Sequence, residues 1–336
     1  MNESQMAMFE FSGLTDDPTL AYFLFAFFLL VYMITLMGNV GLFGIVRRTS
    51  TLQSPMYYFL SYLSLVDLFY STTVTPKMIS DIVSRRKFIS FYGCALQFYF
   101  FAAFATIDVH LLSYMSYDRY AAICHPLHYV SIMTKVKCLR MVGAAFTLGF
   151  LQSSVNTSCI FGLRYCNSNF IDHFHCDIPP LLKISCSDTF TCGIIITSII
   201  GLNTVGSLTT ILISYLFIMV SILKITSSKG RQKAFSTCSS HIMCASIFFV
   251  SVFLTYLHSP SNMADKQSKV AAIFYSVMTP MLNPLIYSLR NQEVKTVIVQ
   301  VVKRCTQMIR LVLSSCHTNL PEVDMRMHKP VKRLQI

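Results

Sequence analysis

Two aspartates, Asp67 and Asp108, stand at comparable depth inside different apolar stretches that are long enough to cross a membrane. Because an ionisable side chain in lipid needs a partner, we expect both carboxyls to face the interior of a helix bundle and to share one cation or one proton. Oxygen ligands suit a hard cation such as sodium. The alternative is a hydrogen-bonded contact between helices in which one acid is protonated. The residues expected to form this polar cluster are Asn39, Asp67, Asp108, Ser113 and Asn283.

A second pair of charged residues closes the third apolar stretch, within Met115–Tyr120 (MSYDRY). Arg119 is long enough to fold back toward Asp118 at the edge of the membrane. Once released, its guanidinium can meet a partner protein, or Tyr215 and Tyr287 on other stretches. A snorkelling arginine at a helix end is the simpler interpretation. Taken alone, the pair favours the snorkelling arginine; taken together with the other motifs of the sequence, it favours a functional pair.

The composition indicates a membrane protein. Hydrophobic residues make up 54% of the 336 residues and charged residues only 12%, against about 25% charged residues in a typical soluble domain. Seven stretches each provide the ~20 residues that a membrane-crossing helix needs. We therefore predict an all-α membrane protein, a seven-transmembrane helix bundle with a short amphipathic helix after the seventh span. The predicted spans are roughly 21–46, 55–79, 93–124, 139–161, 192–225, 234–257 and 269–289.

The distribution of positive charge predicts the orientation of the bundle. No Lys or Arg precedes residue 47, whereas Arg47-Arg48 and the segments 135–140 and 224–233 are basic. Lys and Arg favour the cytoplasmic side, which places the N-terminus outside the cell and the C-terminus in the cytoplasm. The cluster Arg85-Arg86-Lys87 falls on the outer side and departs from this pattern. The net charge of +12 thus reflects topology and attraction to membrane lipid, and nucleic-acid binding is not expected.

The expected location is the plasma membrane. No N-terminal signal peptide is evident, because no basic residue precedes the first apolar stretch, and that stretch is expected to direct insertion. Asn2 begins a glycosylation sequon, Asn-Glu-Ser, on the predicted outer side. The predicted parts are an extracellular N-terminus (1–20), the bundle (21–289), a juxtamembrane helix (290–310) and a flexible basic cytoplasmic tail (311–336).

Four cysteines lie on the predicted outer side, where an oxidising environment makes disulfides the default. Cys94 opens the third stretch, and Cys166, Cys176 and Cys186 lie in the long loop between the fourth and fifth. Four cysteines allow three pairings. We expect Cys94–Cys176 with Cys166–Cys186, which ties the centre of the loop to the third helix and closes its flanks. A zinc site within the segment 173–176 (HFHC) is the alternative, although zinc would use the cysteine as a thiolate, which the oxidising side discourages.

Several motifs in combination resemble olfactory receptors. The resemblance covers about residues 10–310. It implies a rhodopsin-like G-protein-coupled receptor, not an enzyme, which binds small volatile odorants and activates the olfactory stimulatory heterotrimeric G protein to raise cyclic AMP. The stretches that carry it are Pro55–Ser61 (PMYYFLS), Met115–Tyr129 (MSYDRYAAICHPLHY), Lys233–His241 (KAFSTCSSH), Pro280–Asn291 (PMLNPLIYSLRN) and, similar to the outer loop of the tetrapod-type branch, His175–Cys186 (HCDIPPLLKISC).

The resemblance also implies roles for single residues. Arg119, with Tyr215 and Tyr287, would form the activation contact beneath the G protein. Asp108 stands where the family mostly has glutamate, and Phe249 stands where a tyrosine is usual. The residues expected to serve coupling and activation are Asp118, Arg119, Tyr120, Tyr215, Lys233, Asn283, Pro284 and Tyr287.

The outer half of the bundle is expected to hold the ligand between mostly apolar walls, which suit a small volatile molecule. Helix packing is the ordinary role of each aromatic side chain there. Thr106, Asn203 and Tyr256 are better candidates for ligand contact, because a buried polar group wants a partner. No acid stands in this layer of the helices, which disfavours an amine ligand. The candidate ligand-binding residues are Phe98, Phe101, Ala102, Ala105, Thr106, Ile199, Asn203, Phe249, Val252, Phe253, Tyr256, Ile273 and Ser276.

A small ion-coupled secondary transporter is the alternative function. Asp67 and Asp108 would then bind the coupling ion. Transporters usually show internal repeats, and no repeat is evident between the two halves of this sequence. Apart from sodium, no cofactor is expected.

Overall fold

The computed structural model describes residues 8–84, 86–166, 168–256, 262–290, 293–300, 303 and 306–307. Asn2 and the predicted tail over 311–336 lie outside the described residues. Contacts divide the chain into a unit over Met1–Lys295 and a second over Thr296–Ile336. Residues 293–300 are helical, at the start of the predicted juxtamembrane helix.

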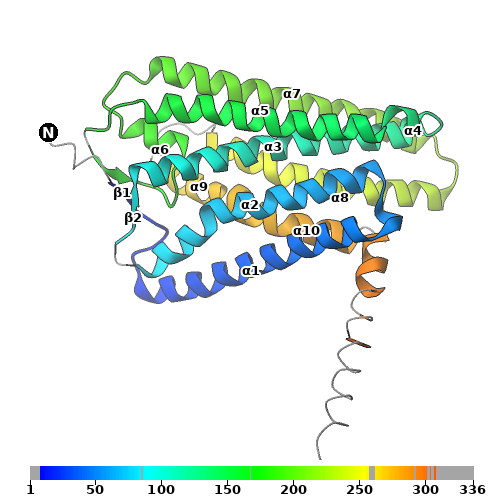
Figure 1. Ribbon diagram of the computed structural model, residues 1–336, viewed down its shortest axis with the longest axis horizontal. Coiled ribbons are helices and arrows are strands. Elements are labelled where there is room, and N and C mark those ends of the chain that lie inside the picture. Colours follow the sequence, from blue (N-terminus) through cyan, green and yellow to red (C-terminus); the bar gives the residue numbers. More distant parts are fainter. Residues whose placement is uncertain are drawn as a thin grey trace, which may run out of the picture. The chain divides into compact units, whose positions relative to one another are not determined.

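Seven long helical segments in the described part of the chain correspond to the seven predicted spans (Figure 1). Pro18 occupies the first turn of the first helix, and the Asp17 carboxylate caps it by accepting a hydrogen bond of 2.8 Å from the Thr19 amide. The seventh segment is continuous but contains a π-helical turn. The segments are α1 (Pro18–Arg48), α2 (Pro55–Val83), α3 (Phe91–Cys124), α5 (Lys135–Phe161), α7 (Phe190–Leu223), α8 (Ser228–Tyr256) and α9–η3–α10 (Asn262–Ile273, Phe274–Met278 and Thr279–Arg290).

Six of these segments in the described residues are long and apolar enough to cross a membrane, and α2 is the exception. Polar residues such as Asp67, Lys77 and Asp81 lower its hydropathy. They are tolerated because α2 packs against α1, α3 and α10 and buries much of its surface. By contrast, α1 and α7 expose large apolar side chains such as Leu30 and Leu202, as surfaces in contact with lipid acyl chains do.

The central helix of the bundle is α3, which packs against α2, α5 and α7. Its approach to α5 depends on a glycine. A Cβ placed on Gly149 would lie 2.5 Å from Cγ1 of Ile107 and 2.9 Å from the carbonyl oxygen of Ala103. Because a real Cβ does not fit at these distances, only glycine allows this contact between the two backbones.

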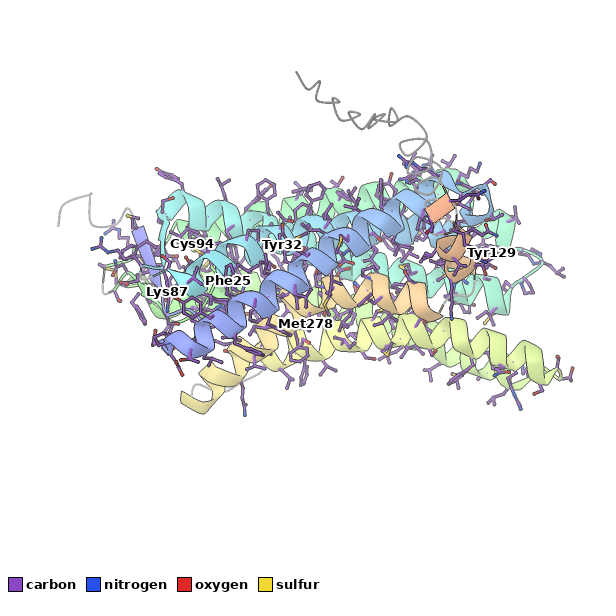
Figure 2. All side chains as sticks on the ribbon, turned by 90° about the horizontal axis from the view of Figure 1, so that it is seen from below. Phe25, Tyr32, Lys87, Cys94, Tyr129 and Met278 are labelled. Carbon is purple, nitrogen blue, oxygen red and sulfur yellow. A yellow bond between two sulfur atoms is a disulfide. The ribbon has the colours of Figure 1, made fainter. Side chains whose placement is uncertain are left out.

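A small sheet, which the all-α prediction did not include, lies at one end of the bundle (Figure 1). Its central strand β1 (Met8–Phe11) pairs antiparallel with β2 (Phe88–Ser90) and parallel with β3 (Phe170–Ile171). Strands this short have no usable periodicity in the sequence, and they form only because three distant segments meet. We call this end the sheet end. Cys94 and Lys87 lie there, whereas Tyr129 lies at the opposite end (Figure 2).

The opposite end, which we call the Arg119 end, carries the shorter connections. They are the 3₁₀ turn η2 (Ser50–Leu52) between α1 and α2, and α4 (Tyr129–Ile132) between α3 and α5. A further short helix, α6 (Ile178–Lys183), belongs to the long loop at the sheet end.

Candidate functional site

Three disulfides hold the sheet end. The predicted bridges Cys94–Cys176 and Cys166–Cys186 are confirmed. A third bridge, Cys159–Cys192, joins α5 to α7; the sequence interpretation missed it because it counted both residues inside predicted spans. The zinc alternative is wrong, since the Cys176 sulfur is in a disulfide. No group of metal-ligating side chains is found among the described residues.

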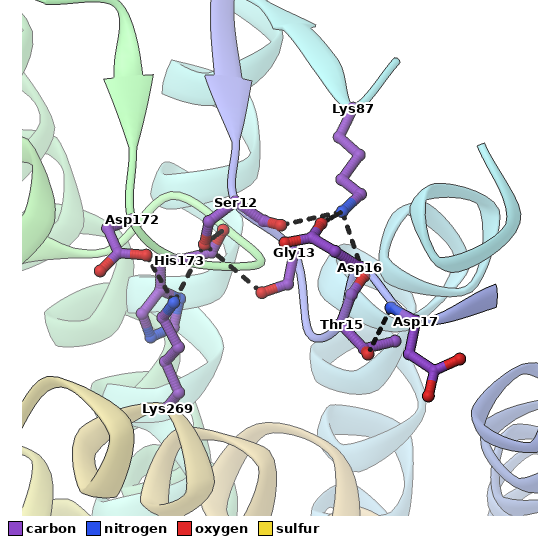
Figure 3. A network of polar contacts seen from close by, with 9 residues as sticks. All are labelled: Ser12, Gly13, Thr15, Asp16, Asp17, Lys87, Asp172, His173 and Lys269. Carbon is purple, nitrogen blue, oxygen red and sulfur yellow. Dashed lines mark hydrogen bonds and ion pairs between the residues drawn. The ribbon is translucent and has the colours of Figure 1, made fainter. Parts of the chain in front are cut away.

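Two lysines tie the N-terminal segment to the rest of the sheet end (Figure 3). The Lys87 ammonium donates to the carbonyl oxygen of Ser12 at 2.9 Å and to the carboxylate of Asp16 at 3.2 Å. The Lys269 ammonium donates to Oδ1 of Asp172 at 2.6 Å and to Oγ of Ser12 at 3.0 Å. Lys87, part of the basic cluster that departed from the charge pattern, therefore serves as a local anchor.

A cavity of about 80 Å³ lies between the helices toward the sheet end. Of the predicted ligand-binding residues, seven line it: Phe98, Phe101, Ala102, Ala105, Thr106, Asn203 and Val252. The remaining lining residues are Tyr70, Val109, Asn156, Asp177, Ile178, Ile200, Thr204, Phe248 and Tyr275.

The structure corrects five other predicted ligand contacts. Ile200 and Phe248 line the cavity in place of Ile199 and Phe249, and Phe253 is 62% exposed on the outside of the bundle. One residue corresponds to a rotation of about 100° around a helix, and a helix that is apolar on every side gives no signal to fix that rotation. Ile273 and Ser276 also do not line the cavity. The side chain of Tyr256 lies outside the described residues.

A buried acid of the loop, Asp177, was missed. Because Asp177 lines the cavity, the expectation that no acid stands in this layer is wrong, and the argument against an amine ligand fails with it. The side chain is 1% exposed and lines the cavity. Its Oδ2 accepts a hydrogen bond of 2.7 Å from the Tyr275 hydroxyl, and its Oδ1 accepts one of 2.7 Å from the Ile178 amide. The loop thus contributes a carboxyl group to a mostly apolar wall.

Two buried histidines of the same loop pack together, with ring centroids 4.6 Å apart. Burial lowers the pKa of His175 to about 3. Burial, and then the proximity of His175, lowers the pKa of His173 to about 3, although the carboxylates of Asp177 and Asp172 act in the opposite direction. Both rings are therefore neutral at pH 7, and the Nε2 of His175 lies 3.8 Å from the Asp177 carboxylate.

The predicted polar cluster is largely assembled inside the bundle. The Nδ2 of Asn283 donates to both carboxylate oxygens of Asp67, at 3.2 and 3.0 Å, and Asp108 lies within electrostatic range of Asp67. The Nδ2 of Asn39 donates to the carbonyl oxygen of Pro280 at 2.9 Å. Ser113 departs from the prediction, because its hydroxyl bonds to the Ser207 carbonyl of α7 at 3.4 Å.

The unsatisfied atoms of this cluster are all acceptors. Among the described residues, no hydrogen-bond partner is found for either carboxylate oxygen of Asp108 or for the amide oxygens of Asn39 and Asn283. Buried acceptors without donors are costly. A bound sodium ion or a proton would satisfy these oxygen atoms. The oxygen atoms therefore fit the expected sodium ion, and they fit a shared proton equally well.

At the Arg119 end, the charged pair is closed. The Arg119 guanidinium donates through Nε, at 3.0 Å, and through Nη2 to Oδ2 of Asp118, which is fully buried. The Tyr129 hydroxyl donates to the other carboxylate oxygen at 2.8 Å. Burial, and then the negative charge of Asp118, raises the pKa of Tyr129, so its hydroxyl stays protonated and available as a donor.

The other residues predicted for coupling make contacts of their own. Tyr215 bonds to Nδ1 of His241 at 2.6 Å, so the expected contact of Arg119 with Tyr215 is not formed in this conformation. Tyr287 is fully buried. The hydroxyl of Tyr120 points to the loop and bonds to Nε2 of His125 at 3.0 Å.

Two more coupling predictions concern Pro284 and Lys233. Pro284 packs against Gly38, where an added Cβ would lie 3.1 Å from its ring. The side chain of Lys233 lies outside the described residues. The sequence interpretation assigned no role to Tyr129 or His241, although both stand in the motifs that carried the resemblance.

Comparison with solved structures identifies the class of fold. The chain matches squid rhodopsin with a TM-score of 0.68 at 20% sequence identity, over 88% of each chain. The seven-helix bundle therefore has the rhodopsin fold of G-protein-coupled receptors.

The sequence comparisons identify the family. The olfactory receptor family model matches residues 28–305. The chain is 46% identical over 303 residues to olfactory receptor 5B21 of Mus musculus, covering 90% of this chain and 95% of the relative. It is 48% identical over 295 residues to olfactory receptor 5B12 of Homo sapiens, covering 88% and 94%. The chain belongs to the olfactory receptor family, whose members are receptors and not enzymes.

Proposed function

We propose that this receptor binds small volatile odorants in the cavity toward the sheet end and activates a stimulatory heterotrimeric G protein that raises cyclic AMP. One observation carries the proposal. The same helix, α3, lines the cavity from Phe98 to Val109 and presents the Asp118–Arg119 pair at its other end. A change in the packing of α3 around a ligand therefore reaches the coupling pair without an intermediate element.

The small size of the cavity supports activation by a population shift, in which the ligand favours a second conformation of the receptor. At about 80 Å³ it is smaller than a typical ligand site of ~300–1,000 Å³. A ligand larger than this volume binds better to a conformation in which the helices have moved apart. Such a difference in affinity is what shifts an equilibrium toward the second state.

The proposed orientation places the sheet end outside the cell, in the plasma membrane. The three disulfides of the sheet end require an oxidising environment. The Arg119 end carries Arg47-Arg48 and Lys135, as the cytoplasmic side of a membrane protein does. Membership in a receptor family removes the reason to consider a transporter.

Substitution of Arg119 tests the coupling. Arg119→Ala should abolish odorant-driven cyclic AMP while leaving surface expression intact, because the guanidinium is the group offered to the G protein. Arg140→Ala, an exposed arginine of α5 at the same end, is the matched control and should signal normally. The measurement is cyclic AMP output in cells screened with volatiles, normalised to surface receptor. Full signalling by Arg119→Ala would refute the proposed coupling.

We also propose that Asp67 and Asp108 hold sodium in the inactive state. The ion would join helices that must rearrange on activation, so sodium should lower agonist potency. Asp108→Asn should remove this dependence and change basal signalling. If the potency measured for the native receptor does not respond to sodium, a shared proton becomes the better account.

A further inference from the structure

A second and larger cavity opens at the Arg119 end. It measures about 640 Å³ and lies between the connection of α1 to α2, over residues 46–61, and the connection of α3 to α5, over residues 129–139. We call it the loop groove. Neither the odorant cavity nor the coupling contact uses it.

The loop groove is cationic. Arg47 and Lys135 face it from opposite sides, and none of its lining residues in the described part of the chain is acidic. Asp118, the acid that contacts the lining residue Tyr129, is already paired with Arg119. Both cations are exposed. The Arg47 guanidinium is held over aromatic rings, 4.9 Å from the centroid of Tyr62 and 5.5 Å from that of Tyr58, so its charge has a fixed place in the groove.

The same groove has an apolar wall that a soluble anion would not need. Val130 is 81% exposed and Leu139 is 59% exposed, and both line the groove. Both cations stand at the ends of membrane-crossing helices, Arg47 in the last turn of α1 and Lys135 in the first turn of α5. A ligand that satisfies cations and exposed apolar side chains at this depth combines an anionic headgroup with acyl chains.

We propose that the loop groove binds an anionic phospholipid of the adjoining leaflet, with its phosphate between Arg47 and Lys135 and its acyl chains along Leu139. The choice of the cytoplasmic leaflet, which is rich in anionic lipid, rests on the orientation in the proposed function. Tyr129 also lines the groove while its hydroxyl holds Asp118. The lipid therefore lies one side chain away from the Asp118–Arg119 pair.

The chain contains no tryptophan, so a single introduced tryptophan reports on its own surroundings. The full chain with Leu139→Trp would be reconstituted in phosphatidylcholine bilayers containing increasing fractions of phosphatidylserine with brominated acyl chains. A second series uses brominated phosphatidylcholine in place of brominated phosphatidylserine. The ratio of tryptophan quenching by the two brominated lipids gives the preference of the groove for the anionic lipid. We expect a preference of roughly 10–30-fold, the size that two basic residues near the membrane surface provide.

Two double variants separate the groove from general surface charge. In the Leu139→Trp background, Arg47→Gln with Lys135→Gln should reduce the preference to nearly one. Arg48→Gln with Arg140→Gln removes two positive charges from the same two helices but not from the groove, and should preserve it. A tryptophan at Leu216, an exposed residue of α7, should show no comparable preference. Lys135→Gln alone, which changes only an exposed side chain, should lower the preference about threefold to fivefold.

Several results would overturn the proposal. Both lipids could quench Leu139→Trp equally, or Leu216→Trp could show the same preference for the anionic lipid as Leu139→Trp. The two double variants could lose the preference to the same extent, or Lys135→Gln could leave it unchanged. The readout needs neither an odorant nor a G protein. Its failure is therefore distinguishable from failure of the proposed coupling, which Arg119→Ala tests separately.

Discussion

The two ends of the helix bundle are held together by different kinds of interaction. Three disulfides, a three-stranded sheet and the contacts of Lys87 and Lys269 fix the sheet end. The Arg119 end relies on side-chain hydrogen bonds, those of Asp118 with Arg119 and Tyr129 and that of Tyr215 with His241. The disulfides found in the described residues all lie at the sheet end.

Under the proposed function, this difference lets one bundle hold the ligand site firmly and still switch. A disulfide cannot open during signalling, whereas a hydrogen bond contributes only ~1 kcal/mol net and can exchange partners. The sheet end therefore keeps the loop over the cavity, and the Arg119 end keeps its pairings reversible.

The largest effect is expected from removing the bridge between α3 and the loop. Cys94→Ser should destabilise the receptor by about 2–5 kcal/mol, the usual cost of a lost native disulfide, and retain it inside the cell. Surface labelling of tagged receptor measures this. Cys124→Ser, at a free cysteine of the Arg119 end that contacts the Ser221 hydroxyl, should reach the surface normally. Normal surface levels of Cys94→Ser would show that the bridge does not hold the sheet end.

The second prediction concerns the close contact between α3 and α5. Gly149→Val should cost about 1–3 kcal/mol through overpacking, because its side chain would collide with Ile107 and Ala103 of α3. Gly143→Val introduces the same side chain on the same helix, where nothing lies within 4 Å of the added Cβ. Thermal denaturation of the purified receptors should separate the two. Equal melting temperatures would contradict the close approach of α3 and α5.

The third prediction is that the sheet end weakens in acid. The folded-state pKa values of His173 and His175 are about 3, below the ~6.5 of an unfolded histidine. The unfolded state therefore takes up protons first, and stability falls as the pH drops from about 6.5 toward 3, by up to about 1.4 kcal/mol per histidine for each pH unit.

Melting temperatures measured at pH 7.5 and pH 5.5 test this dependence. His175→Phe, which keeps a ring against Phe101, should reduce it by about half. His128→Asn, at an exposed residue of the Arg119 end, should leave it unchanged. A dependence that His175→Phe does not alter would have to come from other groups.

The smallest effect is expected at the Arg119 end. Tyr129→Phe removes the hydroxyl that donates a hydrogen bond to Asp118. The closed Asp118–Arg119 pair should become less stable by about 1 kcal/mol, and basal cyclic AMP should rise roughly fivefold. Tyr117→Phe, also a tyrosine of this end, is the control and should leave basal signalling unchanged. Unchanged basal signalling by Tyr129→Phe, at equal surface expression, would mean that this hydrogen bond does not restrain Arg119.

Local patterns in the sequence were sufficient for the helices and the predicted bridges. Continuous apolar runs of membrane length predict helices because lipid leaves backbone groups no other partner. The pairing of Cys94 with Cys176 could be predicted because an oxidising compartment leaves few pairings for the four cysteines recognised on the outer side. The Asp118–Arg119 pair could be predicted because its members are neighbours in the chain.

The tertiary structure decided which side chains meet. A helix that is apolar all round does not reveal its rotation, so Phe248 rather than Phe249 lines the cavity. Asp177 reaches the cavity from a loop, and Lys87 finds its partners in the segment that follows β1, some 70 residues away. Local composition alone therefore predicts a membrane bundle with a charged pair, Asp118–Arg119, at the end of α3. The cavity wall, the sheet and the loop groove depend on distant segments packing together, and only the tertiary structure placed them.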